Sequence, residues 1–100
     1  MIDQLLRTTG SVPLNIAEGS GERLPQRRAY FYRVARSAGA EVGAALDHLV
    51  DMDSLRESDI VAAKRLLVRI VAMLVRLTDR TTATPDSYPP VPRRPQPRKR

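Results

Sequence analysis

Apolar side chains recur at helical spacing in three stretches of the chain, and polar residues fill the positions between them. The first stretch predicts a helix over residues 2–18, with apolar positions Ile2, Leu5, Leu6, Thr9, Val12 and Ile16. Gly19 and Gly21 follow, and we expect them to end this helix in a left-handed conformation. Pro13 lies inside the run, so the helix either bends there or restarts with Ser11 as its cap, and we favour the bend.

The second and third stretches predict longer helices over residues 25–52 and 59–80. Pro25 suits the first position of a helix, and the stripe that follows contains Phe31, Val34, Ala35, Ala38, Val42, Ala45, Leu46 and Leu49. Ser58 or Asp59 is expected to cap the third helix, whose inward positions are Ile60, Ala63, Leu67, Ile70, Leu74 and Leu77. Further apolar residues widen this last stripe to a width typical of a bundle interior or a subunit interface: Leu66, Val71, Met73 and Val75.

The pattern contains neither strand alternation nor an internal repeat. It predicts an all-α fold, an up-down helical bundle of the four-helix-bundle type with three long helices in this chain. Residues 1–80 form the bundle domain in this interpretation. Residues 81–100 are rich in proline and arginine, and we expect them to form a disordered tail.

Composition narrows the classes of function. The chain has 100 residues and no cysteine, which excludes a disulfide framework and a thiolate metal site. The apolar run 60–77 is interrupted by basic side chains, and the N-terminus lacks the features of a signal peptide, so we expect a cytoplasmic protein without a membrane partner. The formal charge of +6 favours an anionic partner, and the tail 81–100 contributes +4 of it.

The segment Ser11 to Arg23 reads Ser-Val-Pro-Leu-Asn-Ile-Ala-Glu-Gly-Ser-Gly-Glu-Arg. It resembles the SIPxNIAEGxGR signature of a small bacterial four-helix-bundle family. That family includes the 23S rRNA intervening-sequence proteins and the accessory variability determinant proteins of diversity-generating retroelements. Phe31, Val34-Ala35-Arg36 and Glu41-Val42 follow at the family's spacing, although Leu24, Arg28 and Ala38 depart from its usual residues.

The resemblance implies a homo-oligomer, with pentameric barrels as the family's assembly, and offers a reverse transcriptase or another protein as a partner. Family members generally have an amphipathic helix before the one that begins here at Met1. We therefore expect the first of the four helices to be absent from this chain. Three helices would leave an apolar groove for a neighbouring subunit or another partner to cover.

Asn15 and Glu18 lie one turn apart, and we interpret them as a structural polar clamp to a neighbouring helix, with Arg36 or Arg33 as the partner. Neither a nucleophile nor a base accompanies them, so we expect no catalytic residues and no enzyme. His48 and the acidic residues around it lack the spacing of a metal site, and neither a metal nor a cofactor is expected. Phe31 is expected in the core, with Tyr30 and Tyr32 at packing or rim positions.

Basic residues are the candidate nucleic-acid-binding set. They fall at the start of the second helix, along the third helix and in the tail: Arg23, Arg27, Arg28, Arg33, Arg65, Arg69, Arg76, Arg80, Arg93, Arg94, Arg98, Lys99 and Arg100. Such a set predicts phosphate-led, salt-sensitive binding with little base readout, because no groove-reading motif is present. RNA is favoured over DNA as the partner.

Two interpretations of function follow. In the first, the chain is a non-enzymatic oligomeric scaffold that binds RNA or DNA through basic faces. The alternative is a protein-interaction adaptor whose missing helix is supplied by a partner or a neighbouring subunit.

Overall fold

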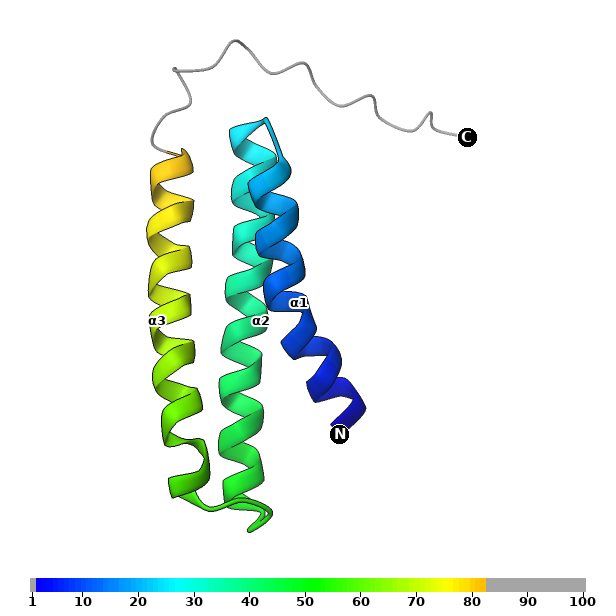
Figure 1. Ribbon diagram of the computed structural model, residues 1–100, viewed down its shortest axis with the longest axis vertical. Coiled ribbons are helices and arrows are strands. Elements are labelled where there is room, and N and C mark those ends of the chain that lie inside the picture. The colour runs from blue at the N-terminus through cyan, green and yellow to red at the C-terminus, as the bar shows by residue number, and fades with distance from the viewer. Residues whose placement is uncertain (1, 83–100) are drawn as a thin grey trace.

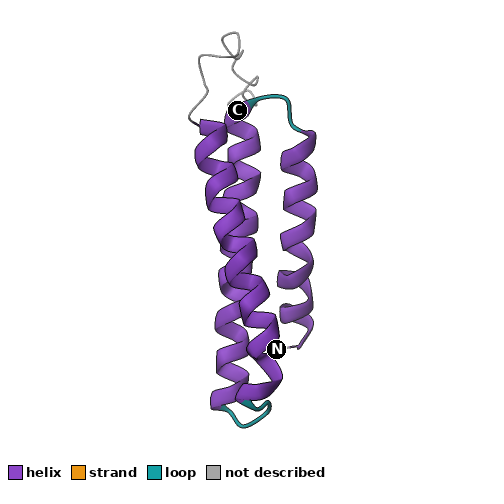
Figure 2. Cartoon of the chain, turned by 60° about the vertical axis from the view of Figure 1, so that its left-hand side comes forward, coloured by secondary structure: helices purple, strands orange, loops and turns teal. Residues whose placement is uncertain are grey.

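The computed structural model describes residues 2–82 as three helices joined by two short connections. They are α1 (Ile2–Gly21), α2 (Pro25–Asp51) and α3 (Glu57–Thr82). Helix α2 packs against α1 and also against α3, and each neighbour runs antiparallel to it (Figure 1). The predicted all-α, bundle-like fold is confirmed (Figure 2). The predicted tail lies outside the described residues, apart from Thr81 and Thr82, which complete α3.

Helix α1 continues unbroken through Pro13, so it does not restart at Ser11. Its first half leans away from α2, as Figure 1 shows, and the direction changes near the middle of the helix. A proline ring crowds the carbonyl one turn earlier and removes one hydrogen bond, which is sufficient to bend a helix without ending it. The predicted bend is therefore the form that the chain adopts.

The predicted glycine stop at the end of α1 is wrong. The helix extends through Gly19 to Gly21, and no glycine in the described chain has a positive φ. The chain turns because the Glu22 amide donates to the Gly19 carbonyl at 3.1 Å, while the Arg28 guanidinium donates to the Glu22 carbonyl at 3.0 and 2.7 Å. The Arg28 side chain of α2 therefore stabilises this turn, a role that the sequence analysis predicted for a left-handed glycine.

Left-handed backbone does occur at the other connection, at Asp53, whose φ is 59°. The Asp53 amide donates to the Val50 carbonyl at 2.9 Å, and the Ser54 amide donates to the Leu49 carbonyl at 2.9 Å. These two bonds form a Schellman motif, with aspartate in the place that glycine usually takes. Helix α2 accordingly ends at Asp51, one residue before the predicted boundary.

Helix α3 begins at Glu57, two residues before the predicted start, and Ser58 does not cap it. The Asp59 carboxylate instead accepts a hydrogen bond at 2.9 Å from the backbone amide of Arg56, three residues earlier. This is the backward-reaching half of a capping box, which places Arg56 at the cap and Asp59 in the first turn. The sequence analysis predicted the cap at Ser58 or Asp59, whereas the structure has it at Arg56.

The core is small and brings all three helices together at one level. Tyr32 and Ala35 of α2 and Leu74 of α3 are buried, and Ile16 and Ile70 pack against them. Tyr32 is 5% exposed whereas Phe31 is only half-buried, so the predicted roles of these two rings are reversed. The reason lies in α1, because Gly19 has no side chain and leaves the space that the Tyr32 ring fills.

The inward stripe of α3 is narrower than predicted. Ile60 and Leu74 are buried, and Thr78 joins them, its hydroxyl donating to the Leu74 carbonyl at 2.7 Å. Ala63 and Leu77 were expected inside but are exposed. A single neighbouring helix covers only part of the circumference of α3, so apolar positions on its two flanks stay in solvent.

Candidate nucleic-acid interface

The arginines proposed for nucleic-acid binding divide into two groups with different surroundings. Arg27 binds the Glu22 carboxylate with two hydrogen bonds, from Nε at 2.9 Å and from Nη2 at 3.0 Å. The hydrogen bond to Glu22 raises the pKa of Arg27 above its usual value. Arg28 is engaged with the Glu22 carbonyl. Both side chains therefore brace the turn between α1 and α2, and neither is free to receive a phosphate.

Helix α3 carries the second group, spaced by four, seven and four residues: Arg65, Arg69, Arg76 and Arg80. We call this set the arginine stripe. At about 100° per residue these positions fall on one side of the helix, opposite the buried Ile60 and Leu74. All four residues are exposed. The stripe extends for about 22 Å along the helix axis.

Three of the four arginines in the stripe have no partner within the described residues. Within residues 2–82, no hydrogen bond or ion pair engages Arg65, Arg69 or Arg76. The adjacent Lys64 is different, because its Nζ lies 2.6 Å from the Asp47 carboxylate of α2, which raises the pKa of Lys64. Arg65, Arg69 and Arg76 therefore carry positive charge on the solvent side of α3 that no side chain within residues 2–82 pairs with.

Two further candidates, Arg23 and Arg33, are exposed on the turn before α2 and on α2 itself. They lie on elements other than α3 and do not extend the arginine stripe. The remaining candidates lie outside the described residues: Arg93, Arg94, Arg98, Lys99 and Arg100. The structure thus singles out the stripe of α3 from the larger basic set.

The structure does not join Asn15, Glu18 and Arg36 into a clamp. The Asn15 amide donates to the carbonyl oxygen of Ser11 at 2.7 Å and to its Oγ at 2.9 Å, within α1. Glu18 is exposed and Arg36 half-buried, and no hydrogen bond or ion pair links either of them to Asn15. The Asn15 amide therefore has its hydrogen-bond acceptors within α1, as is common for asparagine when a neighbouring backbone oxygen is within reach.

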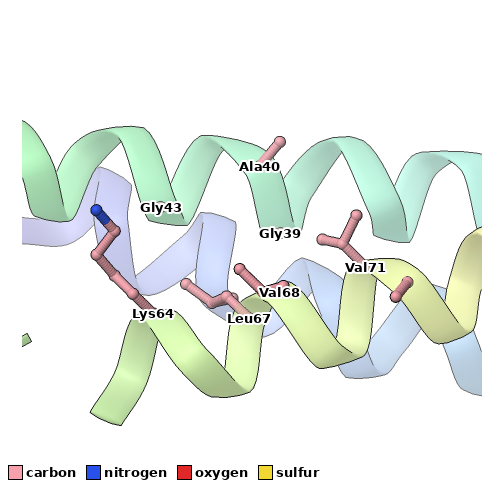
Figure 3. Close-up of a pocket in the computed structure, with 8 residues that line it drawn as sticks. Gly39, Ala40, Gly43, Lys64, Leu67, Val68 and Val71 are labelled. Carbon is pink, nitrogen blue, oxygen red and sulfur yellow. The ribbon is translucent and has the colours of Figure 1, made fainter. Parts of the chain in front are cut away.

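Exposed apolar side chains lie on both flanks of α3. Leu66, Met73 and Leu77 are 56%, 49% and 37% exposed on the flank that also holds Ile70. The opposite flank borders a groove of about 400 Å³ between α2 and α3 (Figure 3), which is lined by Gly39, Ala40, Gly43, Lys64, Leu67, Val68, Val71 and Ala72. We call this the α2–α3 groove. The sequence analysis expected an apolar groove without assigning residues to it, and here Gly39 and Gly43, which have no side chains, line one side of such a groove.

Other classes of site find little support in the described part of the chain. Residues 2–82 contain no group of three or more histidine, cysteine, aspartate or glutamate side chains placed to hold a metal ion. None of the helices between residues 2 and 82 has both the length and the apolar character needed to cross a membrane. His48 is exposed near the end of α2.

Comparison with known proteins identifies the family. Residues 1–76 match the family model described as 23S rRNA-intervening sequence protein. The chain belongs to this family. The match covers α1, α2 and all but the last turns of α3, including Arg65, Arg69 and Arg76. No curated protein and no solved structure gives a significant match to the chain.

Proposed function

We propose that this protein is a non-enzymatic, oligomeric helical scaffold that binds RNA through the arginine stripe of α3. The observation that carries the proposal is the alignment of Arg65, Arg69 and Arg76 on one exposed side of a straight element, without internal partners. Guanidinium groups match phosphate geometry well, and the spacing of these three along about 16 Å of helix suits contact with several phosphates of a nucleic-acid backbone.

Binding of this kind is led by phosphate contacts and depends strongly on salt. Each neutralised phosphate releases counterions, so the observed association constant falls as the salt concentration rises. The family description associates its members with 23S rRNA intervening sequences, which favours RNA over DNA as the partner. The proposal requires no base-specific contact and no reaction step.

The test is a fluorescence-anisotropy titration of a structured RNA over a salt series, with a DNA duplex of the same sequence in parallel. Arg69→Gln should weaken binding and lower the salt slope by about one. Arg7→Gln is the matched control, because Arg7 is exposed on α1 and its removal changes the net charge equally. The absence of binding at low salt, or equal losses in both variants, would refute an RNA site on α3.

The alternative function is that of a protein-interaction adaptor, favoured by the exposed Leu66, Met73 and Leu77 on α3 and Leu6 on α1. A partner helix could lay its own apolar stripe along these positions. The ratio of absorbance at the nucleic-acid and protein maxima of the purified material separates the two functions. Co-purifying nucleic acid supports the scaffold, and a stoichiometric protein without nucleic acid supports the adaptor.

A further inference from the structure

The solvent-facing side of α3 combines charged and apolar side chains in a fixed order around the helix. Helical spacing sets Arg65, Arg69 and Arg76 opposite the buried Leu74, and these three arginines form a central line. Exposed apolar side chains lie about 60–80° to either side of that line, Leu66 and Met73 on one side and Val61 and Val68 on the other. We call this set, the three arginines and the four apolar residues, the α3 outer surface.

The apolar part of the α3 outer surface is well exposed. Val68 is 69% exposed, Leu66 56% and Met73 49%. Val68 stands at the edge of the α2–α3 groove (Figure 3), whereas Leu66 and Met73 lie on the flank that also holds Ile70. Since the described chain leaves these side chains in solvent, a molecule that binds the three arginines can also bury apolar surface on both sides of them.

The middle of α3 carries no negative charge of its own. The sequence has no acidic residue between Ile60 and Thr78, and the carboxylates of α3 stand at its two ends, at Glu57, Asp59 and Asp79. The α3 outer surface therefore offers cations along a line and apolar groups beside it. A complementary ligand is anionic along a line and apolar on either side of that line.

A single strand of RNA has this order of groups. Its phosphates form a line of negative charges, and its unpaired bases turn away from the backbone and expose their flat faces. In a duplex the bases are paired and stacked inside, so a protein helix meets mainly phosphates and sugars. The exposed apolar side chains beside the arginines would then have little apolar surface to cover.

We propose that the α3 outer surface binds an unpaired strand of RNA that runs along α3, an inference that rests on the RNA-binding function proposed above. The phosphates contact Arg65, Arg69 and Arg76, which span about 16 Å of the helix. The bases turn outward and lie against Met73 on one side and Val68 on the other. A thioether such as that of Met73 makes favourable contacts with aromatic rings, which the bases supply.

The order of groups around α3 also distinguishes this ligand from a lipid surface. A helix that lies in a membrane interface places its apolar groups at the centre of the contact and its cations toward the edges. On α3 the arginines hold the centre, and Val68 and Met73 lie at the edges. A flat bilayer would therefore meet the guanidinium groups first and leave the apolar side chains at the margins of the contact.

The affinities of two matched probes test the proposal in the full-length protein. The probes are a short single-stranded RNA without self-complementarity and the same strand annealed to its complement, compared by fluorescence anisotropy at low salt. Phosphate contact alone favours the duplex, because its charge density is higher. Base contact should reverse this order, and we expect the single strand to bind about tenfold more tightly. Equal or tighter binding of the duplex would overturn the proposal.

Met73→Gln separates base contact from phosphate contact. The substitution removes an apolar contact without changing the net charge, so it should weaken single-strand binding about two- to tenfold and leave the salt slope unchanged. Arg69→Gln should lower that slope by about one. Leu14→Gln is the matched control, because Leu14 is 66% exposed on α1, and it should bind as the unmodified protein does. Circular dichroism verifies that each variant is helical, and unchanged binding by folded Met73→Gln would refute the base contact.

A strand that keeps the phosphates but lacks the bases supplies the sharpest comparison. Met73→Gln should have no effect on the binding of this abasic probe, because the contact that it removes is already missing. Arg69→Gln should weaken the binding of both the abasic and the complete strand. If Met73→Gln weakens the two equally, Met73 acts through the structure of α3 and not on a base, and the proposal fails.

Two further outcomes separate this proposal from its neighbours. Vesicles of phosphatidylcholine with phosphatidylserine, assayed by cosedimentation, should bind Met73→Gln and the unmodified protein alike, and binding lost only in the variant would assign the surface to membranes. A protein that binds no RNA probe at low salt refutes this proposal together with the proposed function. A protein that binds duplex RNA in preference refutes only the unpaired strand and leaves RNA binding by α3 in place.

Discussion

The two ends of this bundle are built differently, although the same three helices run through both. At the end where α1 meets α2 in sequence, Tyr32, Ala35 and Leu74 are buried and side chains from all three helices meet. Toward the other end, α1 leans away from α2 (Figure 1), and a hollow there is lined by Gln4, Leu5, Thr8, Glu41 and Ala45. The first end is closed by the chain itself, whereas the second leaves apolar and small residues uncovered.

The comparison shows that small residues have two roles here. Gly19 allows close packing between α1 and α2, because the Tyr32 ring occupies the space beside it. The Tyr32 hydroxyl lies 3.4 Å from Ser20 Oγ. Ala40 and Gly43 border an open groove instead. The space beside Gly19 is already filled by a ring of the same chain, whereas the space beside Ala40 and Gly43 is open to another molecule.

The largest expected effect contrasts a leucine at the closed end with an uncovered one. Leu74 is 1% exposed, so Leu74→Ala should lower the free energy of unfolding by about 2–5 kcal/mol through lost burial and a residual cavity. Leu66 is 56% exposed, and Leu66→Ala should cost less than about 1 kcal/mol. Urea unfolding at one protein concentration measures both. Equal losses would mean that the two positions are equally packed.

The next effect concerns the space beside the Tyr32 ring. A Cβ atom on Gly19 would lie 2.6 Å from Cε1 of Tyr32 and 2.8 Å from its Cδ1, and the buried ring has little room to withdraw. Gly19→Ala should therefore destabilise the protein by about 1–3 kcal/mol, despite the better helix propensity of alanine.

Gly10→Ala is the matched control for this substitution. A Cβ atom at Gly10 of the same helix meets nothing within 4 Å, so the change should be neutral or stabilise the protein by up to about 1 kcal/mol. Thermal unfolding of the two variants decides the matter. A Gly19→Ala protein as stable as Gly10→Ala would show that α1 and α2 are not held closely at Tyr32.

The smallest effect is expected at the ion pair between Lys64 and Asp47, beside the open groove. The hydrogen bond to Asp47 raises the pKa of Lys64, so folding favours the charged form. The resulting stability is fully present below the unfolded pKa of lysine, about 10.4, and is lost as the pH rises through the higher folded value.

Stability measured between neutral and strongly alkaline pH should therefore fall more steeply in the unmodified protein than in Lys64→Gln. The two proteins differ only at position 64, so the difference between the two curves isolates Lys64. Parallel curves would contradict a stabilising pair. The Arg27 and Glu22 pair should contribute no such step, because arginine stays protonated over this range.

Much of the fold could be predicted from local pattern. The apolar spacing identified three helices, and Pro25 marked the start of α2 where the structure has it. The signature from Ser11 to Arg23 resembled the family that the chain belongs to. These inferences succeeded because helical periodicity, proline geometry and a family signature are properties of neighbouring residues.

The predictions that failed required knowledge of which element approaches which. Phe31 and Tyr32 are adjacent and both aromatic, and only the position of Gly19 on α1 decides which ring is buried. Arg27 and Arg28 resembled the arginines of α3 in sequence, but Glu22 binds both of them, whereas Arg65, Arg69 and Arg76 have no partner within residues 2–82. No local pattern separates a bracing arginine from a solvent-facing one.

By itself, the sequence determined that this protein is helical, where its helices lie to within a few residues, and to which family it belongs, because backbone periodicity and capping act over single turns. The tertiary structure decided the identity of the core, the bracing of the first turn by Glu22, and the exposure of the arginine stripe. Burial and charge pairing depend on contacts between distant positions, and those contacts exist only once the helices have packed.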